Sequence, residues 1–567
     1  MDYLLIGVAA AVVIVAVTAL APRAGVAAPL VLVLVGVGVS FLPWVPAIEI
    51  EPEWILAGVL PPLLYSSAVS LPAMDFRRDF SAISGLSVIL VIISAGLMGA
   101  VFTWLIPGIP LATGIALGAI VSPTDAVATS IVKRLGAPPR VVTVLEGEGL
   151  LNDASALVLL RAAIAASAAT VSLGEVARDF LWAVAFAVVC GLVVGRVGLA
   201  VRARLRNVPL STAVSFVVPF LAYVPAEELG ASGLVAVVTA GLVTGSGAAR
   251  HLTPQDRISE TSNWRTVETL LEGAVFLGMG LELFALVEDV LHVHGSVWDA
   301  VGVAAVGAVG VLVIRAAFVL PLLKTLARRR EHGERMREML EGMQDRIAAR
   351  SLEAAAQERT ERFRTRIGRA LADIDYLSSA PLGRDEGVLL VWAGMRGVVT
   401  LAAAQSLPAD TPQRSFLVLV AFVVAAGTLL VQGSTLPWVV RRLGLASGTT
   451  GRETAGMAAL FDVVEGAGLR ALDDDGLRRP DGSRYDPGVV ARVRTDIVRE
   501  LAVQGEDAAE PAEQQAQYLE LRLRTISAQR AALLAARSSG VHDSRQLGSA
   551  LDLLDAEQIA VELRADP

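Results

Sequence analysis

The sequence predicts an all-helical protein that crosses a membrane many times. Of its 567 residues, 54% are hydrophobic, and the mean hydropathy of +0.60 is higher than soluble domains usually reach. Apolar runs at 4–20, 26–42 and 84–106 approach or exceed the roughly 20 residues that a spanning helix needs. The single cysteine, Cys190, excludes a disulfide framework within the chain.

Window hydropathy predicts about thirteen spanning segments. They lie near 3–20, 26–42, 53–71, 84–106, 111–132, 138–169, 174–200, 208–225, 231–248, 264–287, 297–325, 385–407 and 412–440. Alternate loops differ in charge, and one set holds most of the basic residues. That set contains Arg23, Arg77, Arg78, Lys133, Arg134, Arg140, Arg202, Arg204, Arg206, Arg250, Arg257 and the stretch from Lys324. The positive-inside rule places this set in the cytoplasm, so an odd number of spans puts the N-terminus outside and the C-terminus inside.

Two parts of the chain lack the composition of spanning segments. Residues 327–383 are dense in Arg and Glu, and we interpret them as a cytoplasmic helical insert within a membrane domain at 1–442. Residues 449–567 lose the apolar runs and gain acidic clusters such as ALDDDGL, which predicts a cytoplasmic helical tail.

Ionisable side chains inside spanning helices cost about 2.5–3.5 kcal/mol each on insertion scales, so each one needs a physical reason. The candidates are Asp125, Glu148, Asp153, Arg161, Arg196, Glu268, Glu272, Glu282, Arg315 and Arg396. Arg196, Glu268 and Glu282 fall near predicted helix ends, from which they could reach the membrane interface. Arg161 is either a counter-charge for Asp153 or an anchor at a helix end.

Two spanning segments carry signals for a broken helix. In AIVSPTDAVATSIV, Pro123 lacks an amide hydrogen and moves the preceding residue away from helical geometry. In VWAGMRGVVTLAAA, Gly394 and Gly397 flank Arg396. These are the fifth and twelfth predicted spans. Interrupted helices in corresponding positions of two halves are typical of a transporter site between inverted repeats.

A third polar motif, EGEGLLNDASALVLL, opens a long apolar run. On a helix Glu148 and Asn152 are four residues apart and share a face, whereas Asp153 turns away and lies deeper in the run. A carboxylate in that position holds a proton or a cation, but holding both is unfavourable. Oxygen atoms are the ligands that hard cations prefer, and we expect Asp153, Asp125 and Thr124 to supply them to a small alkali cation such as Na+.

Together, SPTDAVATSIV, EGEGLLNDASALVLL and GMRGVVTLAAA resemble the monovalent cation/proton antiporter family of the sodium/proton exchanger type, in its bacterial branch. LPPLLYSSAV and LLEGAVFLGMGLEL add to the resemblance, which covers roughly the whole membrane part. It implies thirteen helices, in a dimerising scaffold and a mobile core, forming a homodimer in the plasma membrane. The expected ligands are Na+ or another monovalent cation and H+, with no cofactor and no nucleic acid.

The resemblance also assigns roles to individual residues. Asp153 corresponds to the aspartate that binds the ion and carries the proton, and Asp125 to the family's second aspartate, with Thr124 contributing oxygen at the break. Asn152 stands where other branches have a further aspartate, which implies electroneutral exchange of one cation for one proton.

Further matches concern structural charges and two departures. Glu148 corresponds to a glutamate that pairs with an arginine, here Arg315, and Arg396 to the arginine of the twelfth span. Many relatives carry serine where this chain has Gly149, so a water would replace that hydroxyl as a ligand. Many also carry an acidic residue where this chain has Ser66, which removes one expected charge partner of Arg396.

Other functions fit the sequence less well. Potassium/proton exchange is the main alternative, and a passive cation channel is a weaker one because it needs no titrating carboxylate. An intramembrane aspartyl protease would use two aspartates, but its usual sequence contexts are absent. A metal-dependent hydrolase needs His or Cys ligands, and all histidines fall outside the predicted membrane cores. These are His251, His292, His294, His332 and His542.

Overall fold

The computed structural model consists of helices and their connections, as the sequence predicts, and no strand occurs in the part of the chain that it describes. That part comprises residues 2–24, 26–43, 50–168, 173–205, 207–294, 296–348, 354–446, 450–474, 476–498, 512–540 and 542–565. Within these ranges eight helices are long and apolar enough to cross a membrane, and four shorter helices are also apolar. The predicted fold class is therefore confirmed. Parts of the predicted insert and tail, 349–353 and 499–511 among them, lie outside the described residues.

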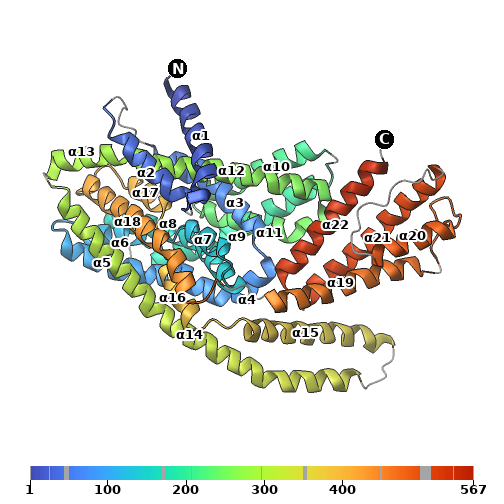
Figure 1. Ribbon diagram of the computed structural model, residues 1–567. Coiled ribbons are helices and arrows are strands. Elements are labelled where there is room, and N and C mark those ends of the chain that lie inside the picture. The colour runs from blue at the N-terminus through green and yellow to red at the C-terminus, as the bar shows by residue number, and fades with distance from the viewer. Residues whose placement is uncertain are drawn as a thin grey trace. The chain divides into compact units, whose positions relative to one another are not determined.

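Figure 1 shows the helices in chain order. The first half contains α1 (Asp2–Leu20), η1 (Ala21–Ala24), α2 (Ala28–Ser40), η2 (Trp54–Val59), α3 (Leu60–Ser70), α4 (Ala73–Ser84), η3 (Gly85–Ile89), α5 (Leu90–Leu105), α6 (Leu111–Ile120), α7 (Ala126–Arg134), α8 (Pro139–Ala168), α9 (Leu173–Arg202), α10 (Val208–Glu228) and α11 (Gly233–His251). The second half contains α12 (Pro254–Leu281), α13 (Leu283–His294), α14 (Trp298–Ala348), α15 (Ala354–Ser379), α16 (Arg384–Trp392), α17 (Val398–Gln405), α18 (Arg414–Arg442), α19 (Thr450–Leu472), α20 (Pro487–Val498), α21 (Ala512–Ser539) and α22 (Ser544–Ala565).

The chain divides into two compact units. The first comprises 1–248, 260–329 and 380–448, and the second comprises 249–259, 330–379 and 449–567. The central insert and the C-terminal tail thus pack in one unit, an association that the sequence pattern did not predict.

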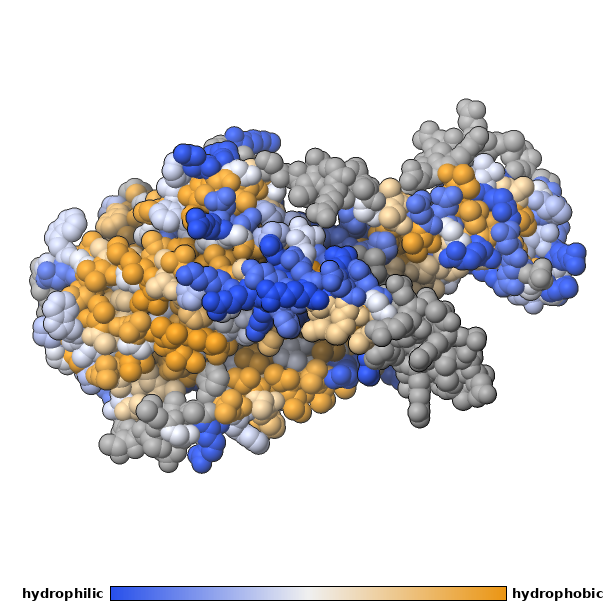
Figure 2. Space-filling model, turned by 90° about the horizontal axis from the view of Figure 1, so that it is seen from below, coloured by the Kyte–Doolittle hydropathy of each residue, from blue (hydrophilic) through white to orange (hydrophobic). Residues whose placement is uncertain are grey.

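The first unit is apolar outside as well as inside. Large apolar side chains such as Trp104, Leu181 and Leu320 are well exposed, and Figure 2 shows hydrophobic residues over much of the visible face. Such a surface is unfavourable in water and suits contact with lipid.

Both predicted helix breaks are present in this unit. Helix α6 ends at Ile120 and α7 begins at Ala126, while α16 ends at Trp392 and α17 begins at Val398. Pro123 lies inside the first break, where its missing amide leaves no helical hydrogen bond unmade. The two interruptions place irregular backbone in the interior of the unit, which is where the candidate site lies.

The second unit is held partly by charges. Asp555 of α22 is almost fully buried and accepts hydrogen bonds from Arg257 Nε at 2.9 Å and from Arg530 Nη2 at 2.8 Å. Arg257 belongs to the first turn of α12, so the loop before that helix is tied to the tail. Helix α15 lies along the second part of α14 (Figure 1), joined by the pair Arg337–Asp375 at 3.0 Å.

Two glycines set the distance between α2 and α12. A Cβ atom on Gly36 would overlap Leu277 O and Gly280 Cα, and one on Gly280 would overlap Val33 O. Small residues allow such close backbone approach in membrane helices, where packing rather than the hydrophobic effect drives association.

We predict that Gly36→Leu destabilises the protein, because a larger side chain must push α2 away from α12. Overpacking of this kind costs about 1–3 kcal/mol. Thermal unfolding of the purified full-length protein in detergent measures the loss. Gly38→Leu is the matched control, since a Cβ on Gly38 of the same helix meets open space. Equal effects of the two substitutions would contradict the proposed packing.

Candidate ion-binding site

The two breaks meet at the centre of the site. The backbone N–H of Asp125, in the first break, donates to the carbonyl oxygen of Met395 in the second, over 2.9 Å. Each break therefore satisfies polar backbone groups of the other, as a membrane interior requires. Four helix ends meet there: the C-terminal ends of α6 and α16 and the N-terminal ends of α7 and α17.

Arg396 lies at the two C-terminal ends. Its Nε donates to Val121 O at 2.5 Å and its Nη1 to Gly394 O at 2.6 Å, and its side chain is 3% exposed. Val121 caps α6, and Gly394 directly follows the cap of α16. The partial negative charge of helix C-terminal ends favours a cation at this place. The family resemblance leads us to expect an acidic partner for Arg396 at position 66, where this chain has Ser66. Main-chain carbonyls contact the guanidinium instead.

Asp125 lies at the two N-terminal ends. It caps α7, with its Oδ1 accepting from Val127 N at 3.3 Å, and its buried Oδ2 has no hydrogen-bond partner among the residues described. Gly397, the N-cap of α17, lies directly against the same carboxylate, and a Cβ atom there would overlap it. Helix N-terminal ends stabilise negative charge, so this position suits an ionised carboxylate.

Glu148 and Arg315 form a buried ion pair between α8 and α14. Arg315 Nη2 donates to Glu148 Oε2 at 2.7 Å, and Nη1 donates to Oε1. Arg315 Nε also donates to Leu390 O of α16 at 2.9 Å. The pair therefore joins three helices, and its two charges compensate each other.

Thr124 and Asn152 extend this network. Asn152 Nδ2 donates to Thr124 Oγ1 at 2.6 Å, and that hydroxyl donates to Glu148 Oε1 at 3.3 Å. Asn152 is 1% exposed, and its Oδ1 has no partner within the described part of the chain. The amide therefore holds the threonine of the break in a fixed position.

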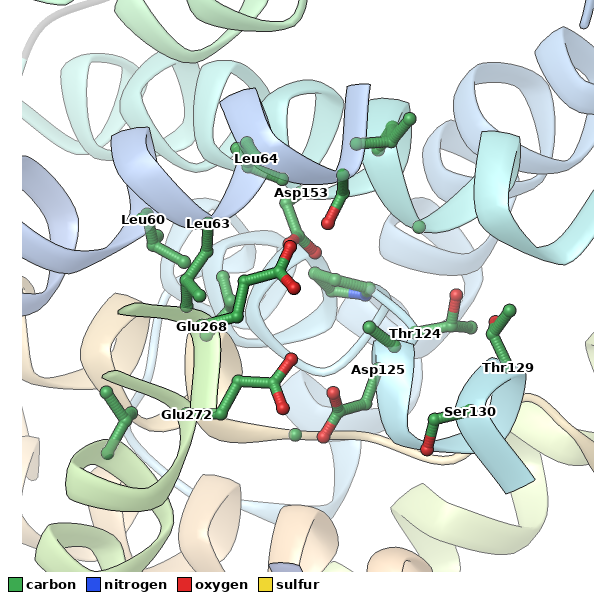
Figure 3. A pocket seen from close by; sticks show the side chains of 18 of the residues that line it. Leu60, Leu63, Leu64, Thr124, Asp125, Thr129, Ser130, Asp153, Glu268 and Glu272 are labelled. Carbon is green, nitrogen blue, oxygen red and sulfur yellow. The ribbon is translucent and has the colours of Figure 1, made fainter. Parts of the chain in front are cut away.

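A cavity of about 300 Å³ opens beside these groups. Asp125, Thr124, Asp153 and Gly149 line it together with Glu268 and Glu272 of α12. Figure 3 shows the carboxylates of Asp125, Asp153, Glu268 and Glu272 pointing into one space. The lining also includes the apolar side chains of Ile55, Leu60, Leu63, Leu64, Val275 and Phe276. Convergent oxygen atoms in such a cavity are chemically suited to a small cation.

The predicted residues thus fall into two groups. Asp153, Asp125 and Thr124 line the cavity. Asn152, Glu148 and Arg315 form the buried hydrogen-bonded network next to it, whereas Arg396 is buried against main-chain carbonyls.

The structure adds to the expected placement of three charged residues. Glu282, expected near a helix end, is only 2% exposed and is therefore buried inside the protein. Glu268, also expected near a helix end, lines the cavity. Arg161 pairs with Glu227 at 2.7 Å, which favours the helix-end anchor over a counter-charge for Asp153.

Glu272 is a charged residue within a predicted span to which the sequence motifs assign no role. A usable signal was present in the sequence, because Glu268 and Glu272 are four residues apart and therefore share one helix face. The partners across the cavity, however, come from segments far away along the chain.

The comparisons with known proteins agree with this fold. Residues 8–442 match the family model described as sodium/hydrogen exchanger, transmembrane. The structure is similar to that of the sodium proton antiporter MjNhaP1 from Methanocaldococcus jannaschii, with a TM-score of 0.57 and 17% identity over 78% of this chain and 100% of that one. The protein is thus a polytopic membrane protein of transporter type. It belongs to the sodium/hydrogen exchanger family, and the family identified from the sequence motifs is confirmed.

Curated relatives are similar over part of their length. An uncharacterized Na+/H+ exchanger of Escherichia coli, YjcE, is 36% identical over 43% of this chain and 46% of its own length. A Bacillus subtilis protein named sodium, potassium, lithium and rubidium/H+ antiporter is 32% identical over 45% of this chain and 39% of its own length. These alignments therefore span less than half of either relative.

We predict that removing one member of the Glu148–Arg315 pair is strongly destabilising, because it leaves an unpaired buried charge. The expected cost of Glu148→Gln or Arg315→Gln is about 3–5 kcal/mol. The double variant should cost less than the sum of the single ones, which a double-mutant cycle of thermal stabilities measures. The exposed pair Lys133–Glu146 is the control, with an expected coupling of about 0–1 kcal/mol. Additive effects at the buried pair would contradict the coupling.

Proposed function

We propose that the protein is a secondary antiporter that exchanges Na+ for H+ across the plasma membrane. The observation that supports this most directly is how the charged side chains are paired where the two helix breaks meet. Arg315 and Arg396 contact Glu148 and main-chain carbonyls, whereas Asp153 and Asp125 face the cavity. Asp153 and Asp125, together with Glu268 and Glu272 in the same cavity, are therefore the carboxylates that a cation or a proton can neutralise. Membership of the sodium/hydrogen exchanger family supports the same conclusion.

The mechanism follows from competition at Asp153. Its side chain is 7% exposed and lies in a membrane helix, where an uncompensated charge is costly. Binding of either a proton or Na+ removes this cost, and each ligand displaces the other. Asp125 and Thr124 contribute further oxygen atoms to the Na+ site. A loaded site then opens to the other side of the membrane by alternating access, typical of transporters with broken helices.

Exchange is proposed to be electroneutral, with one cation for one proton. Asn152 contributes an amide where a further carboxylate would add a second titrating charge, and the amide holds Thr124 instead. Under this proposal the rate of exchange in proteoliposomes is independent of an imposed membrane potential. The functional unit is proposed to be a homodimer, with the N-terminus outside and the C-terminus in the cytoplasm.

Potassium/proton exchange is the second candidate for the transported ion. Two observations support potassium as an alternative transported ion. The Bacillus subtilis relative is named for several alkali cations, and the cavity of this chain has Gly149 where a serine would supply an extra oxygen. A passive cation channel would carry ions without moving protons, and the assay below distinguishes it.

We predict that Asp153→Asn abolishes sodium-driven proton movement, because an amide neither releases a proton nor carries the charge that binds a cation. A pH-sensitive dye in proteoliposomes under a sodium gradient measures the flux. Asp410→Asn, at an exposed aspartate in the loop before α18, serves as the control and should transport normally. Exchange that persists in the Asp153 variant would refute the assignment of this residue.

We predict that Gly149→Ser lowers the KM for Na+. A Cβ at this position meets open space in the cavity, so the side chain fits and adds an oxygen one turn before Asp153. One additional polar interaction of about 0.5–1.5 kcal/mol corresponds to a change of roughly two- to tenfold. Gly149→Ala fills the same space without an oxygen and is the matched control. If serine and alanine give the same KM, the hydroxyl does not ligate the ion.

A further inference from the structure

Glu282 is a buried carboxylate that the proposed exchange at Asp153 does not use. It lies between the end of α12 and the start of α13, and its side chain is almost completely buried. Its Oε1 accepts from the backbone N–H of Ile50 at 2.8 Å, and its Oε2 accepts from Gln405 Nε2 at 2.9 Å. A charge buried in this way is tolerated only where hydrogen bonds replace water, so these contacts are a condition of its placement.

The three residues lie in or close to three elements that line the cavity, η2, α12 and α17. Ile50 shortly precedes Ile55 of η2, Gln405 follows Thr400 of α17, and Glu282 follows Phe276 of α12. Ile55, Thr400 and Phe276 all line the cavity. Through these two hydrogen bonds Glu282 connects three segments of the cavity wall. The residues that it connects lie a few positions along the chain from the lining residues Ile55, Thr400 and Phe276.

The opposite end of the cavity has a different character. Its lining includes Ser70, Lys133, Glu146 and Glu268. Along the chain Glu268 comes first, then Phe276, and Glu282 directly follows α12, so Glu268 and Phe276 mark the two ends of the lining on this helix and Glu282 lies beyond Phe276. Lys133, in the last turn of α7, is one of the basic residues whose positive charge predicts a cytoplasmic location. The Glu282 end is then the one that faces away from the cytoplasm.

We propose that Glu282 is the latch that closes the outer end of the cation cavity. It holds η2, α12 and α17 together through Ile50 and Gln405 while the cavity is open at the Lys133 end. In the opposite state these contacts separate and water replaces them at the carboxylate. Gln405 is a suitable partner because the end of α17 is itself held in place, with Arg414 Nη2 donating to Gln405 O at 2.6 Å. The inference rests on the alternating access of the proposed function.

Thiol labelling tests the latch without requiring transport. In the full-length chain, Cys190→Ala removes the single cysteine, and Thr400→Cys introduces one at the outer end of the cavity lining. A membrane-impermeant cationic thiol reagent is applied to intact cells or to inverted vesicles. With Glu282 present, we expect faster labelling from the cytoplasmic side. With Glu282→Ala, labelling from the outside should rise about tenfold, the factor that corresponds to about 1.4 kcal/mol.

A second variant and a control make the result decisive. Gln405→Leu removes one donor and should also raise labelling from the outside, even if the Glu282 variant does not fold. Glu227→Ala is the matched control, because Glu227 likewise accepts a backbone N–H, from Gly233 at 2.9 Å, together with an arginine, and it is not part of the cavity lining. Unchanged labelling in a folded Glu282 or Gln405 variant would overturn the latch. Failure of the proposed exchange would instead appear as normal transport by the Asp153 variant.

Discussion

The structure depends on one constraint, which is that irregular backbone inside a membrane must find hydrogen-bond partners within the protein. The two helix breaks satisfy this constraint by meeting each other, with the N–H of Asp125 bonded to the carbonyl of Met395. The meeting of the two breaks also brings four helix ends together. Arg396 then lies at the two C-terminal ends and Asp125 at the two N-terminal ends, so each charge is matched by the dipoles beside it.

The same arrangement separates charges that support the fold from charges that are available to ligands. Glu148 and Arg315 compensate each other and join three helices. Asn152 holds Thr124 without adding a charge. Asp153 and Asp125 face the cavity instead. Transport by competition needs this separation, because a carboxylate already paired with an arginine gains little from binding a cation.

The cavity has more acid than the family motifs alone suggest. Glu268 and Glu272 enter it from α12, and Glu282 of the same span lies just past its far end. Helix α12 thus contributes two carboxylates to the cavity, and the proposed latch residue directly follows it. Within the second unit, the first turn of the same helix is tied to the tail through Arg257 and Asp555.

The sequence by itself determined the fold class, the family and the two breaks, because long apolar runs, Pro123 and the motif around Arg396 are local signals. Local patterns also singled out the residues that the structure places where the two helix breaks meet, although their roles in transport remain predictions. Only the tertiary structure decided which oxygen atoms share the cavity and that Glu282 is buried. These depend on partners hundreds of residues apart, such as Ile50 and Glu282, and no periodicity within one helix specifies what a neighbouring helix presents to it.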